Sequence, residues 1–169
     1  INVPYLRSKD SRSELSSIKT NMDYDPSKDY KDFDSWFMKN LNDKVVVITG
    51  AGSGIGRSLA LKMYKLGAKL ALNDLKKNAL DETLSMIDNP ENIYTETFDV
   101  SVKKDFDLFA KNVINHFKKV DVLINNAGIT VGSYSVSETS IEKYEKVIGI
   151  NLWGMIYGTL CFLPELRKQ

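Results

Sequence analysis

A glycine pattern follows directly on an apolar run and could bind a phosphate group. Residues 45–48 are all Val or Ile, which is typical of a buried parallel strand, and Thr-Gly-x-x-x-Gly-x-Gly occupies residues 49–56. We expect a helix to begin near Ile55 or Gly56, so that unpaired backbone N–H groups and the positive end of the helix dipole converge on one point. Because an anionic pyrophosphate fits that point, the segment predicts a dinucleotide-binding turn.

The glycines of this turn meet different needs. Gly50 would take the tight turn, Gly54 would leave room for a phosphate, and Gly56 would let the helix lie close to the strand. The spacing differs from G-x-G-x-x-G, and no Lys-Ser or Lys-Thr follows, which excludes an ATP-type phosphate loop. The residues expected to bind the cofactor here are Gly50, Ser53, Gly54, Ile55 and Gly56.

An acidic residue, Asp74, ends the second expected strand. Its carboxylate can accept hydrogen bonds from the adenosine ribose hydroxyls and would repel a 2′-phosphate, which favours NAD over NADP. Neither Ser53 nor Leu75 offers a cation for that phosphate, but Lys76 and Lys77 lie nearby, so NADP stays the less favoured alternative.

Three further motifs follow in order along the chain. They are Asp99 with Val100 after the third expected strand, Asn-Asn-Ala-Gly at residues 125–128 after the fourth, and Asn151 in the next helix. With the glycine turn and Asp74, these motifs resemble the N-terminal half of the short-chain dehydrogenase/reductase family over about residues 43–169. The resemblance implies an NAD(H)-dependent oxidoreductase that interconverts an alcohol and a carbonyl, with a small molecule as substrate.

The motifs also have a physical interpretation as parts of a cofactor site. Asp99, with Val100 beside it, can accept a hydrogen bond from the adenine amino group. Asn126, Ala127 and Gly128 put small residues and free backbone groups at a strand end beside the cofactor. In the family the residue matching Asn151 holds a water in a proton relay, and we expect Asn151 to be the one catalytic residue present.

The family's remaining catalytic residues, a Ser and a Tyr-x-x-x-Lys pair, belong to a C-terminal half that does not appear before Gln169. Tyr5 with Lys9 and Tyr24 with Lys28 have the right spacing, but both pairs precede the glycine turn, and composition alone predicts about one such match. A positioned acid is needed as negative charge builds on a carbonyl oxygen during hydride transfer. We therefore expect this chain alone to be inactive.

Two other classes of function fit part of this pattern. A non-catalytic NAD-binding or sensor module of the same fold would also lack the Tyr and Lys, and whether the coding frame continues past Gln169 would decide between the two. A methyltransferase that binds S-adenosylmethionine fits the glycines but not residues 125–128 together with Asn151. The substrate's identity does not follow from these residues.

The elements that must position these residues alternate between strand and helix. Strands joined by helices predict an α/β fold, a Rossmann-type doubly wound parallel sheet that stops before the C-terminal strands. Within one helix, apolar residues recur at helical spacing from Phe106 to Phe117, and we expect Ser101 to cap that helix. Thr139 and Glu142 predict a capping box that opens a long helix running towards Pro164. The expected strands span residues 45–49, 69–74, 93–98 and 120–124, and the first two helices span 57–66 and 77–87.

Residues 1–42 differ in composition from the incomplete NAD(P)-binding domain expected over residues 43–169. They are rich in Ser, Lys and Asp and are typical of a polar N-terminal extension. A short amphipathic helix is expected near residues 32–41, because Phe33, Trp36, Phe37 and Leu41 share one helical face. We expect that face to pack on the domain rather than on a membrane.

Composition excludes several partners. A net charge of +1 gives no electrostatic footprint for nucleic acid. Cys161 is predicted to be a buried structural thiol and His116 a surface residue, and no metal site is expected. No apolar stretch of about 18 residues and no signal peptide stand out, so we expect a cytoplasmic protein without a transmembrane segment. We also expect the chain to form a homo-oligomer.

Overall fold

The computed structural model describes residues 41–132 and 135–168. Apart from Leu41, the amphipathic helix expected near residues 32–41 lies outside the described residues. The strands are β1 (Val45–Thr49), β2 (Lys69–Asp74), β3 (Ile93–Thr97) and β4 (Val122–Ile124). The helices are α3 (Gly54–Lys65), α4 (Lys77–Ser85), α5 (Lys103–Phe117), α6 (Ile141–Ile148) and α7 (Met155–Leu166), with a 3₁₀ turn η1 (Val136–Glu138) and a π-helical segment η2 (Gly149–Gly154).

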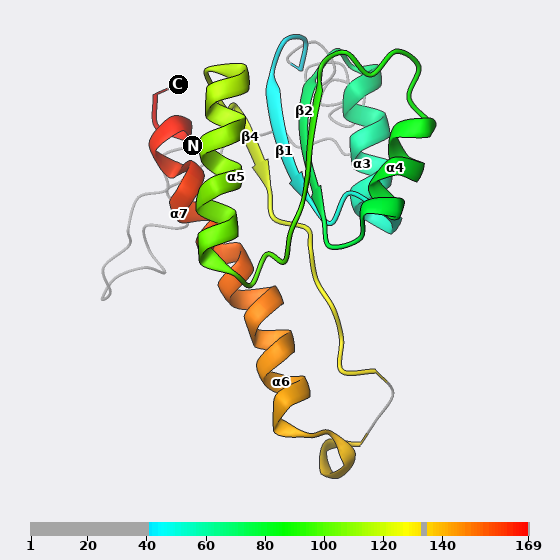
Figure 1. Ribbon diagram of the computed structural model, residues 1–169, viewed down its shortest axis with the longest axis vertical. Coiled ribbons are helices and arrows are strands. Elements are labelled where there is room, and N and C mark those ends of the chain that lie inside the picture. Colours follow the sequence, from blue (N-terminus) through cyan, green and yellow to red (C-terminus); the bar gives the residue numbers. More distant parts are fainter. Residues whose placement is uncertain (1–40, 133–134, 169) are drawn as a thin grey trace, which may run out of the picture. The chain divides into compact units, whose positions relative to one another are not determined.

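The four strands form one parallel sheet in the order β3-β2-β1-β4. Helices α3 and α4 cover one face, and α5 and α7 cover the other (Figure 1). The central strand β1 is buried along its whole length because both of its faces are covered, which explains its unbroken Val and Ile sequence. The chain therefore has a Rossmann-like α/β fold, as the sequence predicts.

An aromatic cluster fills the layer between the sheet and α5. Phe106 and Phe109 of α5 are fully buried, with ring centroids 6.3 Å apart. Phe98 packs on both of them at 5.3 and 5.1 Å, and Phe162 of α7 meets Phe109 edge to face at 6.1 Å. The helical stripe predicted over residues 106–117 thus faces the core, and α5 ties α7 to the sheet.

Two predicted helix starts are wrong. Ser101 does not cap α5: the N-cap residue is Val102, and the Ser101 hydroxyl donates instead to Asp99. The capping box lies one turn earlier than predicted, between Ser135 and Glu138, where it closes the short η1 turn. The Thr139 hydroxyl donates to the Ser135 carbonyl and does not cap α6, whose N-cap residue is Ser140.

The segments α6, η2 and α7 form one continuous helix, Ile141–Leu166. Its 26 residues include an apolar stretch long enough to cross a membrane by length and composition, so the expectation that no such stretch exists is corrected. A core helix of a soluble protein meets the same two criteria. Here one side of the helix packs inward, where Gly154, Gly158 and Phe162 are buried.

The sequence contains one histidine and one cysteine, and it predicted the exposure of the histidine better than that of the cysteine. His116 is exposed, as predicted, and its ring packs on Tyr94 and Phe117. Cys161 is half-buried rather than buried, and its thiol donates to Asp107 at 3.3 Å. Burial, followed by the Asp107 carboxylate, raises the pKa of the Cys161 thiol to about 11, so this thiol is a poor nucleophile.

Candidate functional site

The glycine turn joins the end of β1 to the start of α3. Gly50 and Gly54 both have left-handed backbones, with φ of +66° and +52°. Ser53 is the N-cap residue of α3, and the helix begins at Gly54, slightly before the predicted start. The first turn of α3 carries no acidic side chain. The positive end of the helix dipole is therefore not neutralised there, which favours an anion.

Two glycines of the turn face opposite environments. Gly54 is exposed, and no protein atom lies within 4 Å of the position that its Cβ would occupy. Gly56 is buried, and a Cβ there would overlap the Gly50 carbonyl oxygen and come within 2.6 Å of the Asn126 side chain. Gly54 thus leaves space outside the protein, whereas Gly56 lets α3 pack on the turn and on the end of β4.

A cleft of about 510 Å³ lies at the carboxyl ends of the strands. It brings together predicted cofactor-binding residues from four separate segments. Those that line it are Gly50, Ser53, Gly54, Ile55, Asp74, Leu75, Asp99, Val100, Asn126, Ala127 and Gly128. Gly56 lies behind the turn, and Asn151 does not line the cleft. Binding of a ligand by these residues stays a prediction, but the fold does assemble them at one place.

Asp74 ends β2 and holds the backbone around it. One carboxylate oxygen accepts from the Gly52 N–H at 2.9 Å, and the other accepts from the Lys76 N–H at 3.0 Å. A carboxylate oxygen can accept more than one hydrogen bond, so both oxygens keep capacity for hydroxyl donors. The two backbone bonds fix the orientation in which Asp74 meets the cleft.

Asp99 follows β3 and lines the same cleft as Asp74. Its Oδ1 atom accepts from the Ser101 N–H at 2.9 Å and from the Ser101 hydroxyl at 2.7 Å. Its Oδ2 atom has no hydrogen-bond partner among the described residues. Asp99 is therefore rigidly held while one oxygen stays available as an acceptor at the cleft.

Residues 125–128 connect the end of β4 to the glycine turn and to α7 through hydrogen bonds. The N–H groups of Asn126 and Ala127 both donate to the Thr49 hydroxyl, at 3.0 and 3.1 Å. The prediction that these backbone groups are free is therefore wrong. The Asn126 side chain donates to the carbonyls of Thr49 and Gly50. Asn125 donates to the Met155 carbonyl and to the Thr159 hydroxyl of α7. The motif thus fixes the turn against the end of β4.

Asn151 lies within η2, the π-helical segment of the long helix. Its side-chain oxygen accepts from the Ile129 N–H, and its side-chain nitrogen donates to the Ile129 carbonyl, both at 2.9 Å. Asn151 therefore holds the segment that leaves β4 beside the cleft. The relay role stays a prediction, and the side-chain amide is already bonded on both sides. Single π-helical turns are frequent at functional sites.

The sequence did not single out three residues that shape the cleft. Arg57 and Glu82 line it, and the buried Thr83 lies behind Arg57. Arg57 directly follows Gly56, and this place next to the glycine turn was the only feature of the sequence that could have pointed to it. The other two residues lie on α4, so only the tertiary structure shows that they reach the turn.

Comparison with known proteins identifies relatives for most of the described chain. A family profile described as short chain dehydrogenase matches residues 44–169. The 11-beta-hydroxysteroid dehydrogenase 1A of Arabidopsis thaliana is 40% identical over 140 residues, which cover 81% of this chain and 40% of that protein.

Solved structures share the fold. The 3-ketoacyl-(acyl-carrier-protein) reductase from Brucella melitensis, complexed with NADH, gives a TM-score of 0.72 at 30% identity, covering 76% of this chain and 52% of that chain. A short chain dehydrogenase/reductase from Burkholderia phymatum, in complex with NAD, gives a TM-score of 0.70 at 35% identity, covering 75% and 45%. This chain spans about half the length of these proteins, or less.

Proposed function

The chain belongs to the short-chain dehydrogenase family, and we propose that residues 43–169 form the NAD(H)-binding half of an oxidoreductase that interconverts an alcohol and a carbonyl. One observation supports this most directly. A single cleft joins the N-terminus of α3 to the carboxylates of Asp74 and Asp99. A dinucleotide needs these groups together, because it carries a pyrophosphate, a ribose with two hydroxyls and an adenine amino group.

The residues present fit each part of the cofactor. The open space beside Gly54 and the N-terminus of α3 would hold the pyrophosphate. Asp74 would accept from the adenosine ribose hydroxyls, and the unpartnered oxygen of Asp99 would accept from the adenine amino group. The exposed Leu75 and the buried Val100 flank these two acids and would contact the adenine ring.

When bound, NAD supplies the hydride acceptor and NADH the hydride donor. The protein's part is to hold and orient the cofactor. The hydrogen bonds from residues 126 and 127 to Thr49 keep the glycine turn fixed against β4, and Asn151 holds the segment around Ile129 along the cleft. A fixed cleft reduces the entropy lost when the cofactor binds, since fewer groups need to be ordered.

We expect NADH to bind more tightly than NADPH. The Asp74 carboxylate lines the cleft, and a 2′-phosphate on a ribose bound beside it would meet a like charge. Lys76 lines the same cleft, and its positive charge would offset part of that repulsion. The preference therefore depends on which of the two charges dominates, and Asp74 is the better fixed of them.

Cofactor fluorescence titration of the 169-residue chain tests this proposal. Asp74→Asn should weaken NADH binding by roughly tenfold, because neutral hydrogen bonds replace charged ones, and should narrow the preference over NADPH. Asp88→Asn is the matched control, since Asp88 is exposed and does not line the cleft. If NADPH bound as tightly as NADH, the assignment of NAD would be withdrawn. If neither bound, the proposed function would be wrong for this chain.

A further inference from the structure

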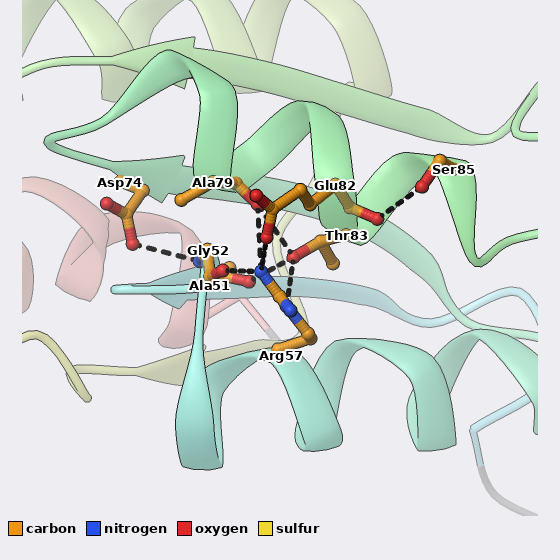
Figure 2. A network of polar contacts seen from close by, with 8 residues as sticks. All are labelled: Ala51, Gly52, Arg57, Asp74, Ala79, Glu82, Thr83 and Ser85. Carbon is orange, nitrogen blue, oxygen red and sulfur yellow. Dashed lines mark hydrogen bonds and ion pairs between the residues drawn. The ribbon is translucent and has the colours of Figure 1, made fainter.

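Gly52 of the glycine turn is hydrogen-bonded through both of its backbone polar groups. Its N–H donates to Asp74 at 2.9 Å, and its carbonyl accepts from the Arg57 guanidinium (Figure 2). A Cβ at Gly52 would come within 2.7 Å of both Asp74 and Ala79, so no other residue type fits without a shift of its neighbours. The carboxylate of Asp74 and the cation of Arg57 are thus separated by one residue.

Arg57 also connects the turn to α4. Its Nε–H donates to the Thr83 hydroxyl at 3.0 Å, and its guanidinium forms an ion pair with Glu82 at 2.8 Å (Figure 2). The Thr83 hydroxyl in turn lies 2.9 Å from the Ala51 carbonyl. These bonds leave the Arg57 side chain 21% exposed, and both Arg57 and Glu82 line the cleft beside Asp74.

The charge of Arg57 is therefore available to the cleft only in part. Glu82 is its carboxylate partner within the described residues, and the Glu82 side chain is 62% exposed. An arginine next to a ribose site is suited to hold a 2′-phosphate, because its guanidinium stays charged and can donate several hydrogen bonds. Glu82 offsets this positive charge, and because its side chain is the more exposed of the pair, its carboxylate also faces a ligand more directly than the guanidinium does.

We propose that Glu82 is a second specificity-determining residue, which disfavours a cofactor carrying a 2′-phosphate by neutralising Arg57 and by direct repulsion. This inference rests on the proposed function, because it concerns the same cofactor site. It assigns the preference for NADH to two acids, Asp74 at the end of β2 and Glu82 on α4, rather than to Asp74 alone.

The expected size of the effect follows from simple electrostatics. A 2′-phosphate carries about −1.5 to −2 charges at neutral pH. Removing one unit charge several ångströms away, in a largely solvated setting, should change its affinity by roughly three- to tenfold. NADH lacks this group, so its affinity should change by less than about twofold.

Glu82→Gln is the sharpest test, because the glutamine amide can still accept a hydrogen bond from Arg57 but carries no charge. The measurement is the ratio of the NADPH to the NADH dissociation constant, obtained by fluorescence titration of the 169-residue chain at low salt. We expect this ratio to fall roughly three- to tenfold. Glu145→Gln is the matched control, because it makes the same change at an exposed residue of α6 that does not line the cleft, and the ratio should stay constant.

Two further measurements separate charge from loop geometry. The fall in the ratio should shrink as salt is added, because ions screen exposed charges, whereas a distorted turn would weaken both cofactors at every salt concentration. In an Arg57→Gln background, Glu82→Gln should change the ratio less, because no cation remains to be released. That background also shows whether Arg57 is needed for NADH binding itself.

The outcomes distinguish this inference from the proposed function. If Glu82→Gln binds NADH normally and its ratio is unchanged, the role of Glu82 is overturned while the proposed function stands. A fall in the ratio that persists undiminished at high salt would also overturn it, since charge would not be the cause. If the unmodified chain binds neither cofactor, the proposed function fails, and this inference fails with it.

Discussion

The backbone of Gly54 is left-handed, and the space where a Cβ would stand is empty of protein atoms. Gly56, two residues on, is buried and is restricted by the backbone of Gly50. The two positions therefore demand glycine for different reasons. At Gly54 the reason is backbone conformation and the space left for a ligand, whereas at Gly56 it is packing within the protein.

Gly54→Val tests whether that empty space is the phosphate site. The valine side chain would occupy the space, and we expect NADH affinity to fall more than tenfold, a loss of about 1.4 kcal/mol or more. Circular dichroism should show that the strands and helices remain. Gly132→Val is the matched control for backbone strain, because Gly132 also has a positive φ, of +89°, and does not line the cleft.

The outcome for Gly54→Val depends on both measurements. Unchanged affinity would contradict the placement of the pyrophosphate at the start of α3. If folding were lost together with binding, Gly54→Ala would provide the test, since a single methyl group enters the same space with less strain on the backbone. Weakened binding in that variant, with the fold intact, would support the placement.

At the scale of elements, Asp121 links β4 to β1 at the amino ends of these strands, at the opposite end of the sheet from the cleft. Its carboxylate accepts from the Val45 N–H at 2.9 Å and pairs with Lys44 and Lys119, both at 2.9 Å. Burial pushes the pKa of Asp121 upward, but the hydrogen bonds from Val45, Lys44 and Lys119 outweigh burial and leave the pKa below its usual value. The ionised carboxylate therefore stabilises the folded chain.

Asp121→Asn should lower the free energy of unfolding at pH 7 by about 1–3 kcal/mol, because charged hydrogen bonds become neutral ones. A lowered pKa gives stabilisation that is present above the unfolded-state value, near 4, and is lost as the pH falls through the folded-state value. The difference between the two proteins in urea unfolding should therefore narrow below about pH 4. A difference that stays constant down to pH 3 would contradict this assignment.

The control for Asp121 is an exposed ion pair on a single helix. Asp81 pairs with Lys77 on α4, and both side chains are more than half exposed. Asp81→Asn should change stability by less than about 0.5 kcal/mol, because solvent screens the pair. Similar effects of the two substitutions would show that Asp121 does not hold β1 and β4 together.

The sequence predicted the bounds of some elements correctly and those of others only in part. The predicted bounds of β1 and β2 both match the structure, where an apolar run fills most of β1 and the centre of β2. The fourth strand is shorter than predicted and begins at Val122. At Asp121 the backbone N–H donates to the Val45 carbonyl, but the Val45 N–H donates to the Asp121 side chain and not to a backbone carbonyl of the neighbouring strand. The sequence did not reveal that the backbone hydrogen bonds around Asn151 change from the α-helical to the π-helical pattern in η2.

The candidate site divides in the same way. The glycines, Asp74, Asp99 and residues 126–128 stand next to strand ends in the sequence, and parallel strands bring those ends together. Arg57 and Glu82 are 25 residues apart and meet only because α3 and α4 pack on the same face of the sheet. A contact that depends on helix packing leaves no local pattern, which is why the sequence did not reveal it.

At the scale of the whole molecule, the β4 edge of the sheet is poorly covered. β4 is the last strand of the described sheet, and all three of its residues are only half-buried, whereas β1 is fully buried. The long helix beside it exposes several large apolar side chains over about half of their surface. These are Ile141, Ile148, Leu152, Trp153, Met155 and Leu160. Exposed apolar area of this extent, next to an open strand edge, favours association.

We therefore expect the 169-residue chain alone to form dimers or larger assemblies and to show no dehydrogenase turnover. None of the residues that line the cleft is a tyrosine or a histidine, so no obvious group in the described part of the chain is placed to donate a proton to a carbonyl oxygen. Gel filtration with thermal unfolding measures the first expectation, and an NAD-linked assay on a panel of secondary alcohols measures the second.

Trp153→Ser, which removes an exposed apolar ring from η2, should shift the chain towards monomer and leave NADH binding unchanged, because Trp153 does not line the cleft. A monomer with a sharp, cooperative transition would show that the open edge is closed by the chain itself. Turnover above background would show that another residue of this chain takes the place of the tyrosine.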